Sequence, residues 1–550
     1  MLSYRKLAMR VLSCPLHTGR GIDSPRPASQ RAAAFILTAA MLTTLAAPAF
    51  AGTWYIEDGD ITVKAGETEG TNKVSQGNKK DVEDTNTIIT NREDKASSNT
   101  VTIDAGSDKV EVTLQDVNIK ADSGSALTSK GDVTLTLKGD NHLTGGISGT
   151  GNYGRNGIAS TGSLTISGGE NDSLTAQGGS GADGSYGGHG IYSNGSLTIS
   201  GGTVNANGGD GSNVNGSGIS SNGSVTISGG TVNATGGNGS HGGNGIYSRS
   251  SLTISGGTVN ATGGSGEDGG DGIRSFDPVA ISGGTVTAKG GSGEDGSGGR
   301  GIYSIKSVTI SGGTVNANGG NSTNSSGGYG ISSLDVAISG GTVTANGGDS
   351  KDGYGGDGIH SNDIDLSGSL ELTAKAGSPN GKALSQNGRE LDLNAIKDKL
   401  GPGAKVTATD ANGETKQVSI PRPVEPEGPV IPGDSSSSSD GGSAAPSAPA
   451  FSLPGLTVTD KDGQRISYTS TQSGNTLTVC VGRFTASFRI SLAALRQLRA
   501  EGIETITFQT ILCSTTLSVD ELLAMGGEDA EVVLTHHIRS STLTVGGKAV

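Results

Sequence analysis

The chain has few of the residues that build a thick globular core. Of its 550 residues only 3% are aromatic and 31% are hydrophobic, whereas 96 are glycine. A large α/β enzyme with an aromatic-rich core is therefore excluded, because too little apolar volume is present to fill it. Disordered segments are also rich in glycine, serine and asparagine. The regular spacing described below argues against disorder.

Positive charge and cysteine are scarce as well. The formal net charge is −14, which disfavours nucleic acids and anionic membrane surfaces as partners. Of the three cysteines, Cys14 precedes a cleavage signal, so that Cys480 and Cys513 remain after processing. An exported protein can keep a disulfide, but the spacing of these two residues leaves open whether they pair.

One apolar run indicates targeting. Ala32–Ala47 follows several arginines and precedes Ala49-Phe50-Ala51, an A-x-A cleavage signal. The run is short for a membrane span. We therefore expect residues 1–51 to be a signal peptide that is removed before Gly52. The mature protein is then secreted or attached to the cell surface, without a membrane span.

An internal repeat dominates the middle of the chain. The dipeptide Gly-Ile recurs eight times between residues 157 and 359, with its isoleucines 27 to 33 residues apart. One unit, Gly245–Asp271, reads GIYSRSSLTISGGTVNATGGSGEDGGD. It contains three short runs that alternate apolar and polar residues, the pattern of strands with one buried face. A unit this thin buries its apolar face only against copies of itself, so the repeat predicts a parallel β-solenoid.

The alternation also predicts which side chains point inward. In this unit Ile246, Leu252 and Val259 are expected to face the interior, and Tyr247 is expected to face outward. The Gly256-Gly257 pair allows a sharp corner with positive φ between two strands.

Composition divides the rest of the chain. Trp54, the only tryptophan, is expected to cover the open end of the solenoid, because such ends need caps. Ser491 and Ser518 are expected to cap two short helices near the C-terminus. The expected regions are a cap with irregular first coils (52–150), regular coils (151–378), a degenerate end of the solenoid (379–420), a flexible Pro/Ser/Gly linker (421–454) and a small α+β domain (455–550).

Acidic residues recur in the loops between coils. Glycine-rich strings place Asp183, Asp268 and Asp295 at the same offset in their units, and Asp352 shares that offset. Stacked coils would bring such carboxylates into vertical register, where Ca²⁺ could bridge them. A solvated turn, in which each Asp bonds its own backbone, explains the same pattern. The candidate calcium ligands are Asp183, Asp268, Asp271, Asp295, Asp352 and Asp357.

Tyrosine placement indicates a binding surface. Exposed rings along a rigid ladder suit stacking on sugars, whereas the alternative is that they only shield the sheet, since tyrosine fits exposed strands well. Five candidate carbohydrate-binding residues follow the Gly-Ile of their coils, namely Tyr192, Tyr247, Arg274, Tyr303 and His360; two more, Tyr186 and Tyr354, lie five residues before the isoleucine.

The repeat resembles that of a known family. It is similar to the bacterial carbohydrate-binding β-helix proteins that are structurally similar to pectate lyases. The likeness is carried by VTLTLKGDNHLTGG (Val133–Gly146), GIASTGSLTISGG (Gly157–Gly169) and the later GIYSxxSLTISGGTVNAxGG units, and covers roughly residues 54–377. It implies a right-handed parallel β-helix, calcium in the loops and affinity for plant cell-wall polysaccharides or acidic sugars. No catalytic residue of the lyases matches a position here.

The expected function is therefore calcium-assisted, non-catalytic binding of a polysaccharide. Neither a Ser/His/Asp nor a Cys/His set stands out in the sequence. Two alternatives stay open. One is a structural or adhesin-like stalk that displays the C-terminal domain, since solenoids are extended. The other is a polysaccharide lyase, which rests on analogy of fold.

Overall fold

The computed structural model describes most of the chain after the expected signal peptide. The described residues are 52–148, 153–181, 185–421 and 456–549, the last range with gaps at 461–464, 467, 474, 482–484, 511–513, 526–529, 537–540 and 547. The chain divides into two compact units, Met1–Pro426 and Glu427–Val550. The expected signal peptide and residues 422–454 of the expected linker lie outside the described residues.

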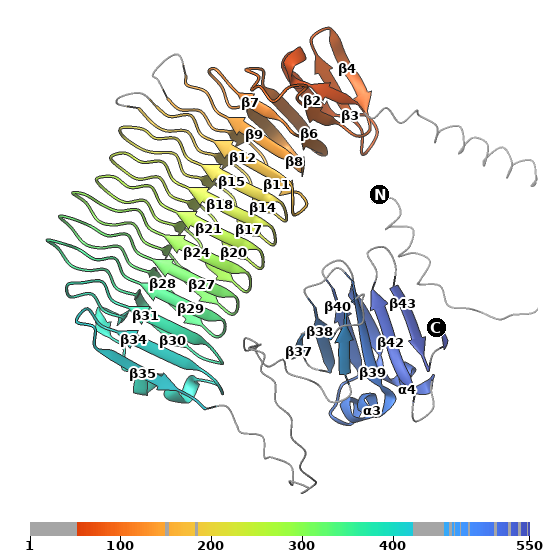
Figure 1. Ribbon diagram of the computed structural model, residues 1–550, viewed down its shortest axis with the longest axis vertical. Coiled ribbons are helices and arrows are strands. Elements are labelled where there is room, and N and C mark those ends of the chain that lie inside the picture. The colour runs from red at the N-terminus through yellow and green to blue at the C-terminus, as the bar shows by residue number, and fades with distance from the viewer. Residues whose placement is uncertain are drawn as a thin grey trace, which may run out of the picture. The chain divides into compact units, whose positions relative to one another are not determined.

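The first unit is a solenoid of parallel strands in which each coil has three faces (Figure 1). In one coil, Ile246–Ser248 (β19) lies on face 1, Leu252–Ile254 (β20) on face 2 and Thr258–Thr262 (β21) on face 3. Each strand pairs in parallel with its counterpart in the next coil, so that like residues lie opposite each other. The predicted all-β fold, a parallel β-helix followed by a small domain, is confirmed.

The same three faces continue through the unit. Face 1 contains β10 (Ile158–Ser160), β13 (Ile191–Ser193), β16 (Ile219–Ser221), β22 (Ile273–Ser275), β25 (Ile302–Ser304) and β32 (Leu384–Gln386). Face 2 contains β11 (Leu164–Ser167), β14 (Leu197–Ile199), β17 (Val225–Ile227), β23 (Val279–Ile281) and β26 (Ser307–Ile310). Strands β6 (Val101–Gln115), β8 (Leu127–Lys138), β28 (Ile331–Ile338) and β30 (Ile359–Leu366) run through both faces. Face 3 contains β7 (Asn118–Lys120), β9 (Asp140–Thr144), β12 (Ser173–Gln177), β15 (Thr203–Asn207), β18 (Thr231–Thr235), β24 (Thr285–Lys289), β27 (Thr314–Asn318), β29 (Thr342–Asn346), β31 (Glu371–Lys375) and β34 (Lys405–Thr409).

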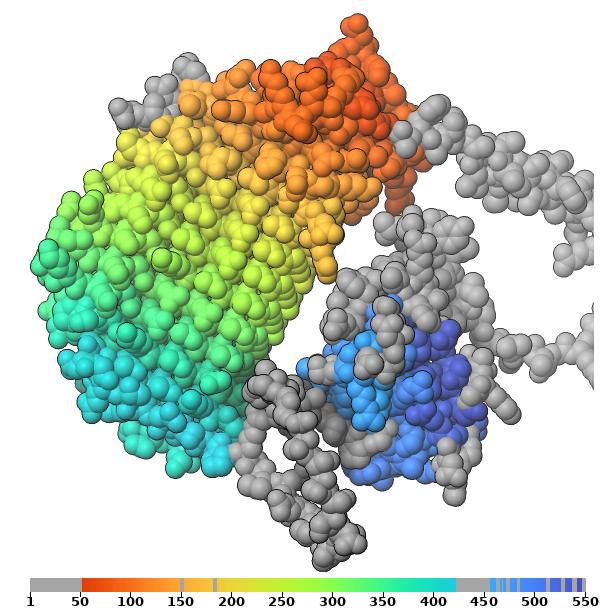
Figure 2. Space-filling model, viewed as in Figure 1, coloured from red at the N-terminus to blue at the C-terminus, as the bar shows by residue number. Residues whose placement is uncertain are grey.

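Columns of small aliphatic side chains fill the interior. Ile246, Leu252 and Val259 are fully buried, as predicted, and their counterparts in neighbouring coils are buried too. Ser248 also turns inward, and its hydroxyl donates to the carbonyl of Gly223 in the preceding coil (3.1 Å), which satisfies a polar group that would otherwise destabilise the core. Gly257 has φ +79°, so the predicted corner needs glycine there. Successive coils form continuous bands across the surface in Figure 2.

Between face 3 and face 1 each coil extends into a thin double layer, which we call the glycine fin. Figure 1 shows these segments as arms that project from one side of the stack. The amide of Gly270 donates to the carbonyl of Gly264 in its own coil, and the carbonyl of Gly270 accepts from Gly291 of the next coil, both at 2.8 Å. A Cβ on Gly270 would lie 2.0 Å from the carbonyl oxygen of Gly243, so no larger residue fits.

Antiparallel strands close the N-terminal end. After β1 (Thr53–Tyr55) and the 3₁₀ turn η1 (Ile56–Asp58), the chain forms β2 (Ile61–Ala65), β3 (Asn72–Gln76), β4 (Lys79–Asp84) and β5 (Ile88–Thr90). Strands β2, β3 and β4 pair in antiparallel fashion, and β1 pairs in parallel with β5. Trp54 is buried among the first core residues at this end.

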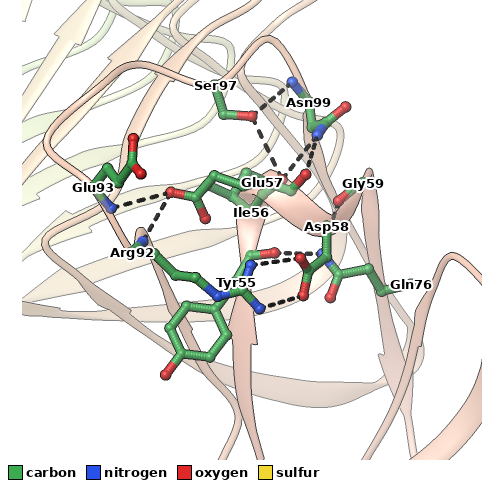
Figure 3. Close-up of polar contacts among 10 residues, drawn as sticks. All are labelled: Tyr55, Ile56, Glu57, Asp58, Gly59, Gln76, Arg92, Glu93, Ser97 and Asn99. Carbon is green, nitrogen blue, oxygen red and sulfur yellow. Dashed lines mark hydrogen bonds and ion pairs between the residues drawn. The ribbon is translucent and has the colours of Figure 1, made fainter.

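Polar contacts fix the 3₁₀ turn of this cap (Figure 3). Arg92 forms two charge-assisted hydrogen bonds with Asp58 (2.5 and 2.7 Å), and its guanidinium lies 4.1 Å from the ring centroid of Tyr55. The side-chain amide of Gln76 donates to the backbone carbonyls of Tyr55 and Gly59 (2.6 and 2.9 Å). The 3₁₀ turn is therefore held by two separate segments of chain.

The region expected to be a degenerate end continues the solenoid and then closes it. Strand β34 adds a further parallel strand to β31, and β35 (Thr415–Ser419) turns back on β34 in antiparallel fashion. Strand β33 (Arg389–Glu390) turns back on β32 in the same way, before the 3₁₀ helix η2 (Leu393–Lys399). Antiparallel strands at both ends interrupt the parallel stacking that would otherwise leave open sheet edges.

The described residues of the second unit form two sheets and two helices. Ser491 and Ser518 cap the helices as predicted, since their hydroxyls accept from the amides of Ala494 (3.1 Å) and Glu521 (3.4 Å). No helix within the described ranges is long and apolar enough to span a membrane. One sheet contains β36 (Leu456–Thr459), β39 (Ala486–Ser491), β42 (Glu531–His536), β43 (Ser541–Val545) and β44 (Lys548–Ala549); the other contains β37 (Thr469–Ser473), β38 (Thr476–Cys480), β40 (Thr505–Gln509) and β41 (Ser514–Ser518); the helices are α3 (Leu492–Ala500) and α4 (Val519–Ala524).

Candidate functional site

The residues that follow Gly-Ile form an outward column on face 1, which we call column 1. The predicted alignment of its tyrosines with Arg274 and His360 is confirmed, with serines in two intervening coils. Its five aromatic or charged side chains are half-buried, because residues of neighbouring coils pack against them. In order, column 1 contains Tyr192, Ser220, Tyr247, Arg274, Tyr303, Ser332 and His360.

The residues that precede Gly-Ile form column 2, beside column 1. Backbone hydrogen bonds between coils align His189, Ser217, Asn244, Asp271, Arg300, Tyr329 and Asp357. Several of these side chains accept a backbone N–H from the next coil. Asn244 Oδ1 accepts from Asp271 (3.0 Å), Asp271 Oδ1 from Arg300 (2.8 Å) and Asp357 Oδ1 from Lys382 (2.7 Å). Sequence reasoning selected only Asp271 and Asp357 here, as calcium ligands. The signal for the rest was a polar residue in front of each Gly-Ile.

Two arginines flank the ring of Tyr303. The guanidinium of Arg300 lies 4.0 Å from the ring centroid and that of Arg274 lies 5.4 Å from it, within the range of cation–π contacts. Arg274 Nη1 is 3.5 Å from Asp271 Oδ2. Burial raises the pKa of Asp271, and the charges of Arg300 and Arg274 oppose that rise. Arg274 Nε is buried without a hydrogen-bond partner among the described residues. The two arginines thus place positive charge beside an aromatic ring.

A second cluster lies one coil further along. The rings of Tyr329 and His360 are stacked, with centroids 4.4 Å apart and an interplanar angle of 5°. His360 Nδ1 is 2.7 Å from Asp357 Oδ2. Burial, with a contribution from the Asp357 charge, raises the pKa of Tyr329. Both carboxylate oxygens of Asp357 therefore have protein partners.

At the other end of the two columns, His189 stacks on Tyr192 with ring centroids 5.7 Å apart. The amide of Ser217 donates to His189 Nδ1 (2.9 Å), which places the ring proton on Nε2. Burial lowers the pKa of His189 to about 4. His189 is therefore neutral at pH 7. Its Nδ1 accepts a backbone N–H from the next coil, as Asn244 Oδ1 does elsewhere in column 2.

The positions five residues before the isoleucine form column 3, at the outer part of the fin. Tyr186 and Tyr354 occupy it as predicted, and they are 44% and 66% exposed. They are not neighbours, because Val214, His241, Asp268, Ser297 and Ser326 lie between them in the column. Tyr186 instead contacts Tyr153, with ring centroids 5.4 Å apart.

Columns 2 and 3 are the two banks of a groove, and the glycine fin is its floor. The groove has a volume of about 440 Å³. It spans four coils, which at the usual strand spacing of about 4.8 Å corresponds to about 14 Å along the stack. The side chains on its banks belong to His241, Asp268, Ser297 and Ser326 on one side and to Asn244, Asp271, Arg274, Arg300 and Tyr329 on the other.

The other candidate calcium ligands that the structure describes bond to different partners. Asp268 accepts from the amide of Ser297 (3.2 Å) and contacts His241 Nδ1 (3.1 Å), whereas Asp295 accepts from Asn324 (2.7 Å). Asp352 is exposed, and Asp183 lies outside the described residues. Within the described part of the chain, no three His, Cys, Asp or Glu side chains are grouped to hold a metal. Calcium in these loops stays a prediction.

The pairing of Cys480 with Cys513 stays an open alternative. Cys480 lies on β38 and is half-buried, with its Sγ 3.5 Å from Gln509 Oε1. Partial burial raises the pKa of its thiol. Cys513 lies outside the described residues.

Comparison with known proteins supports the architecture of the coils. The model of the beta helix repeat family matches residues 197–223, 225–244, 252–273, 279–302, 308–333 and 336–363. The matched coils are similar to beta helix repeats, in agreement with the parallel β-helix fold. The matched ranges include column 2 from Ser217 to Asp357 and every groove residue except Arg274, but of column 1 they include only Ser220, Ser332 and His360. Searches of curated proteins and of solved structures found no match.

Proposed function

We propose that the beta helix repeats bind a polysaccharide along the groove, without cleaving it, on or outside the cell. The observation that carries this proposal is the placement of Arg274, Arg300 and Tyr303 beside a groove that runs along the stack. The coil spacing of about 4.8 Å is of the same order as one sugar unit. A linear polymer lying along the groove would therefore meet similar backbone geometry at each successive unit.

The chemistry of the groove suits an acidic sugar. Guanidinium groups donate paired hydrogen bonds to carboxylates, and an aromatic ring offers an apolar face to a sugar ring. These groups stand on a backbone that the ladder of coils holds in place, so little ordering is needed when the ligand binds. Calcium would add a bridge between acidic loops and acidic sugars.

Affinity electrophoresis of the chain from Gly52 to Val550 tests the proposal. Gels would contain homogalacturonan, alginate, a neutral xylan or no polymer, each with calcium or with a chelator. We expect retardation by an acidic polymer. Arg300→Ala should weaken binding about tenfold, as expected for loss of a central arginine contact. Tyr303→Ala should also weaken it, because the Tyr303 ring packs against the Arg300 guanidinium beside the groove. Lys289→Ala is the matched control, because Lys289 is exposed on face 3, outside the groove.

The same gels separate the alternatives. Retardation that is lost with chelator supports calcium assistance, whereas retardation unaffected by chelator assigns binding to the side chains alone. Unsaturated products that absorb in the ultraviolet would show that the protein is a lyase and would refute non-catalytic binding. Free migration in every gel would contradict binding to these polymers and favour the structural stalk.

A further inference from the structure

A buried carboxylate without a cation lies at the N-terminal cap. Asp84, at the end of β4, is 1% exposed. Its Oδ1 accepts from the amides of Gly52 (2.9 Å) and Asn86 (3.0 Å), and its Oδ2 accepts from Trp54 Nε1 (2.8 Å). The ion pairs at this end join Lys64, Lys73, Arg92 and Lys109 to other acids, and none among the described residues includes Asp84. Burying an unpaired carboxylate is costly.

One donor to this carboxylate is the backbone nitrogen of Gly52, the residue that follows the expected cleavage signal. Gly52 is held from both sides, since its carbonyl accepts from Ile88 (3.1 Å). A Cβ at this position would lie 2.5 Å from both Asp84 Oδ2 and Trp54 Nε1. Only glycine therefore fits between the strand and the buried acid.

We propose that the Asp84 carboxylate binds a new N-terminal amine that proteolytic processing forms at Gly52. A signal peptidase adds water across the Ala51–Gly52 bond; Ala51 leaves with the new carboxylate, and Gly52 keeps the amine, which takes up a proton at neutral pH. The separation of 2.9 Å suits a charge-assisted hydrogen bond between ammonium and carboxylate. Cleavage thus converts a neutral amide contact into a buried ion pair, which completes the cap. This inference is independent of the proposed function.

Two matched chains test the inference. One begins at Gly52 and the other at Ala51, so that they differ only in whether the nitrogen of Gly52 is an amine or an amide. We expect hydrogen exchange at the amides of Trp54 and Tyr55 to be about tenfold slower in the chain that begins at Gly52. Asp84→Asn keeps an acceptor and removes the charge, so the two chains should then exchange alike. Equal exchange in the unmodified pair, or a difference that survives Asp84→Asn, would overturn the proposal.

A pH titration covers the case in which Asp84→Asn fails to fold. Pairing with Asp84 raises the pKa of the amine in the folded state above its unfolded value of about 7.7–8.0. The added protection should be complete below pH 7 and be lost as the pH rises through the higher folded value. Acetylation of the Gly52 amine should abolish it at every pH. N-terminal sequencing of the exported protein should give Gly52; any other start would refute the processing step.

Discussion

Acidification should destabilise the solenoid through His189. Its half-buried ring stacks on Tyr192, and its Nδ1 accepts from the backbone amide of Ser217, a bond that only the neutral ring can accept. The pKa of His189 is about 4 in the folded chain, against about 6.5 for an unperturbed histidine. Between these two values the unfolded state binds a proton that the folded state does not. Stability is therefore unaffected above pH 7 and falls as the pH drops towards 4.

The size of the effect follows from the two pKa values. The loss amounts to about 2 kcal/mol at pH 5 and about 3 kcal/mol at pH 4. His189→Asn should remove it, because Asn244 provides the same kind of acceptor to the next coil elsewhere in column 2. At pH 7 the variant should match the unmodified protein to within about 0.5 kcal/mol.

Urea unfolding of both proteins between pH 4 and 7 checks this prediction. Carboxylates contribute equally to both curves, so the difference between the two unfolding free energies isolates His189. That difference should grow in favour of His189→Asn as the pH falls. In parallel, the NMR signals of the His189 imidazole should titrate near pH 4. A flat difference curve, or a titration midpoint near 6.5, would refute the assignment of a half-buried, neutral ring.

Two further substitutions test the packing of the coils. Gly270→Ala should lower the unfolding free energy by about 3 kcal/mol, because its Cβ would overlap the carbonyl of Gly243. The control Gly124→Ala should leave the urea midpoint unchanged, because a Cβ there meets nothing within 4 Å. Similar midpoints for the two variants would contradict the close packing of the fin. Asn233→Leu should cost about 1–3 kcal/mol, because Asn233 donates to Asn205 and accepts from Asn260, both at 2.8 Å. Asn233→Thr should cost less, since threonine occupies the same column in β24, and equal losses for Leu and Thr would rule out a role for the amide ladder.

The coils themselves were predictable from the sequence, because in a parallel stack the residues at the same offset in each unit occupy the same position on each coil. The alternation in Gly245–Asp271 gave the inward residues, and the glycine pair gave the corner with positive φ at Gly257. The fin was not predictable. Its composition is that of a disordered loop, and hydrogen bonds such as the one from Gly270 to Gly264 are what distinguish a packed double layer from a flexible one.

The alignment of column 1 was predictable from the sequence, and that of column 2 was predictable only in part. Tyrosine recurs in column 1, so its alignment was visible as a pattern of residue type. Column 2 changes type from coil to coil, and its members share only their offset. Asp271 and Asp357 were selected for their charge. Their role in accepting an amide from the next coil depends on side-chain direction, which periodicity does not contain.

The irregularity of column 2 is itself an argument for binding. On face 3 the central outward position keeps threonine or asparagine through the regular coils, and Asn205, Asn233 and Asn260 bond to one another there as a ladder that stabilises the stack. A column with the same single purpose would repeat one acceptor in the same way. Column 2 instead contains Arg300, whose side chain has no acceptor at all, beside the groove and next to Tyr303. Stacking of the coils does not require an arginine there, which supports the proposed binding of a ligand.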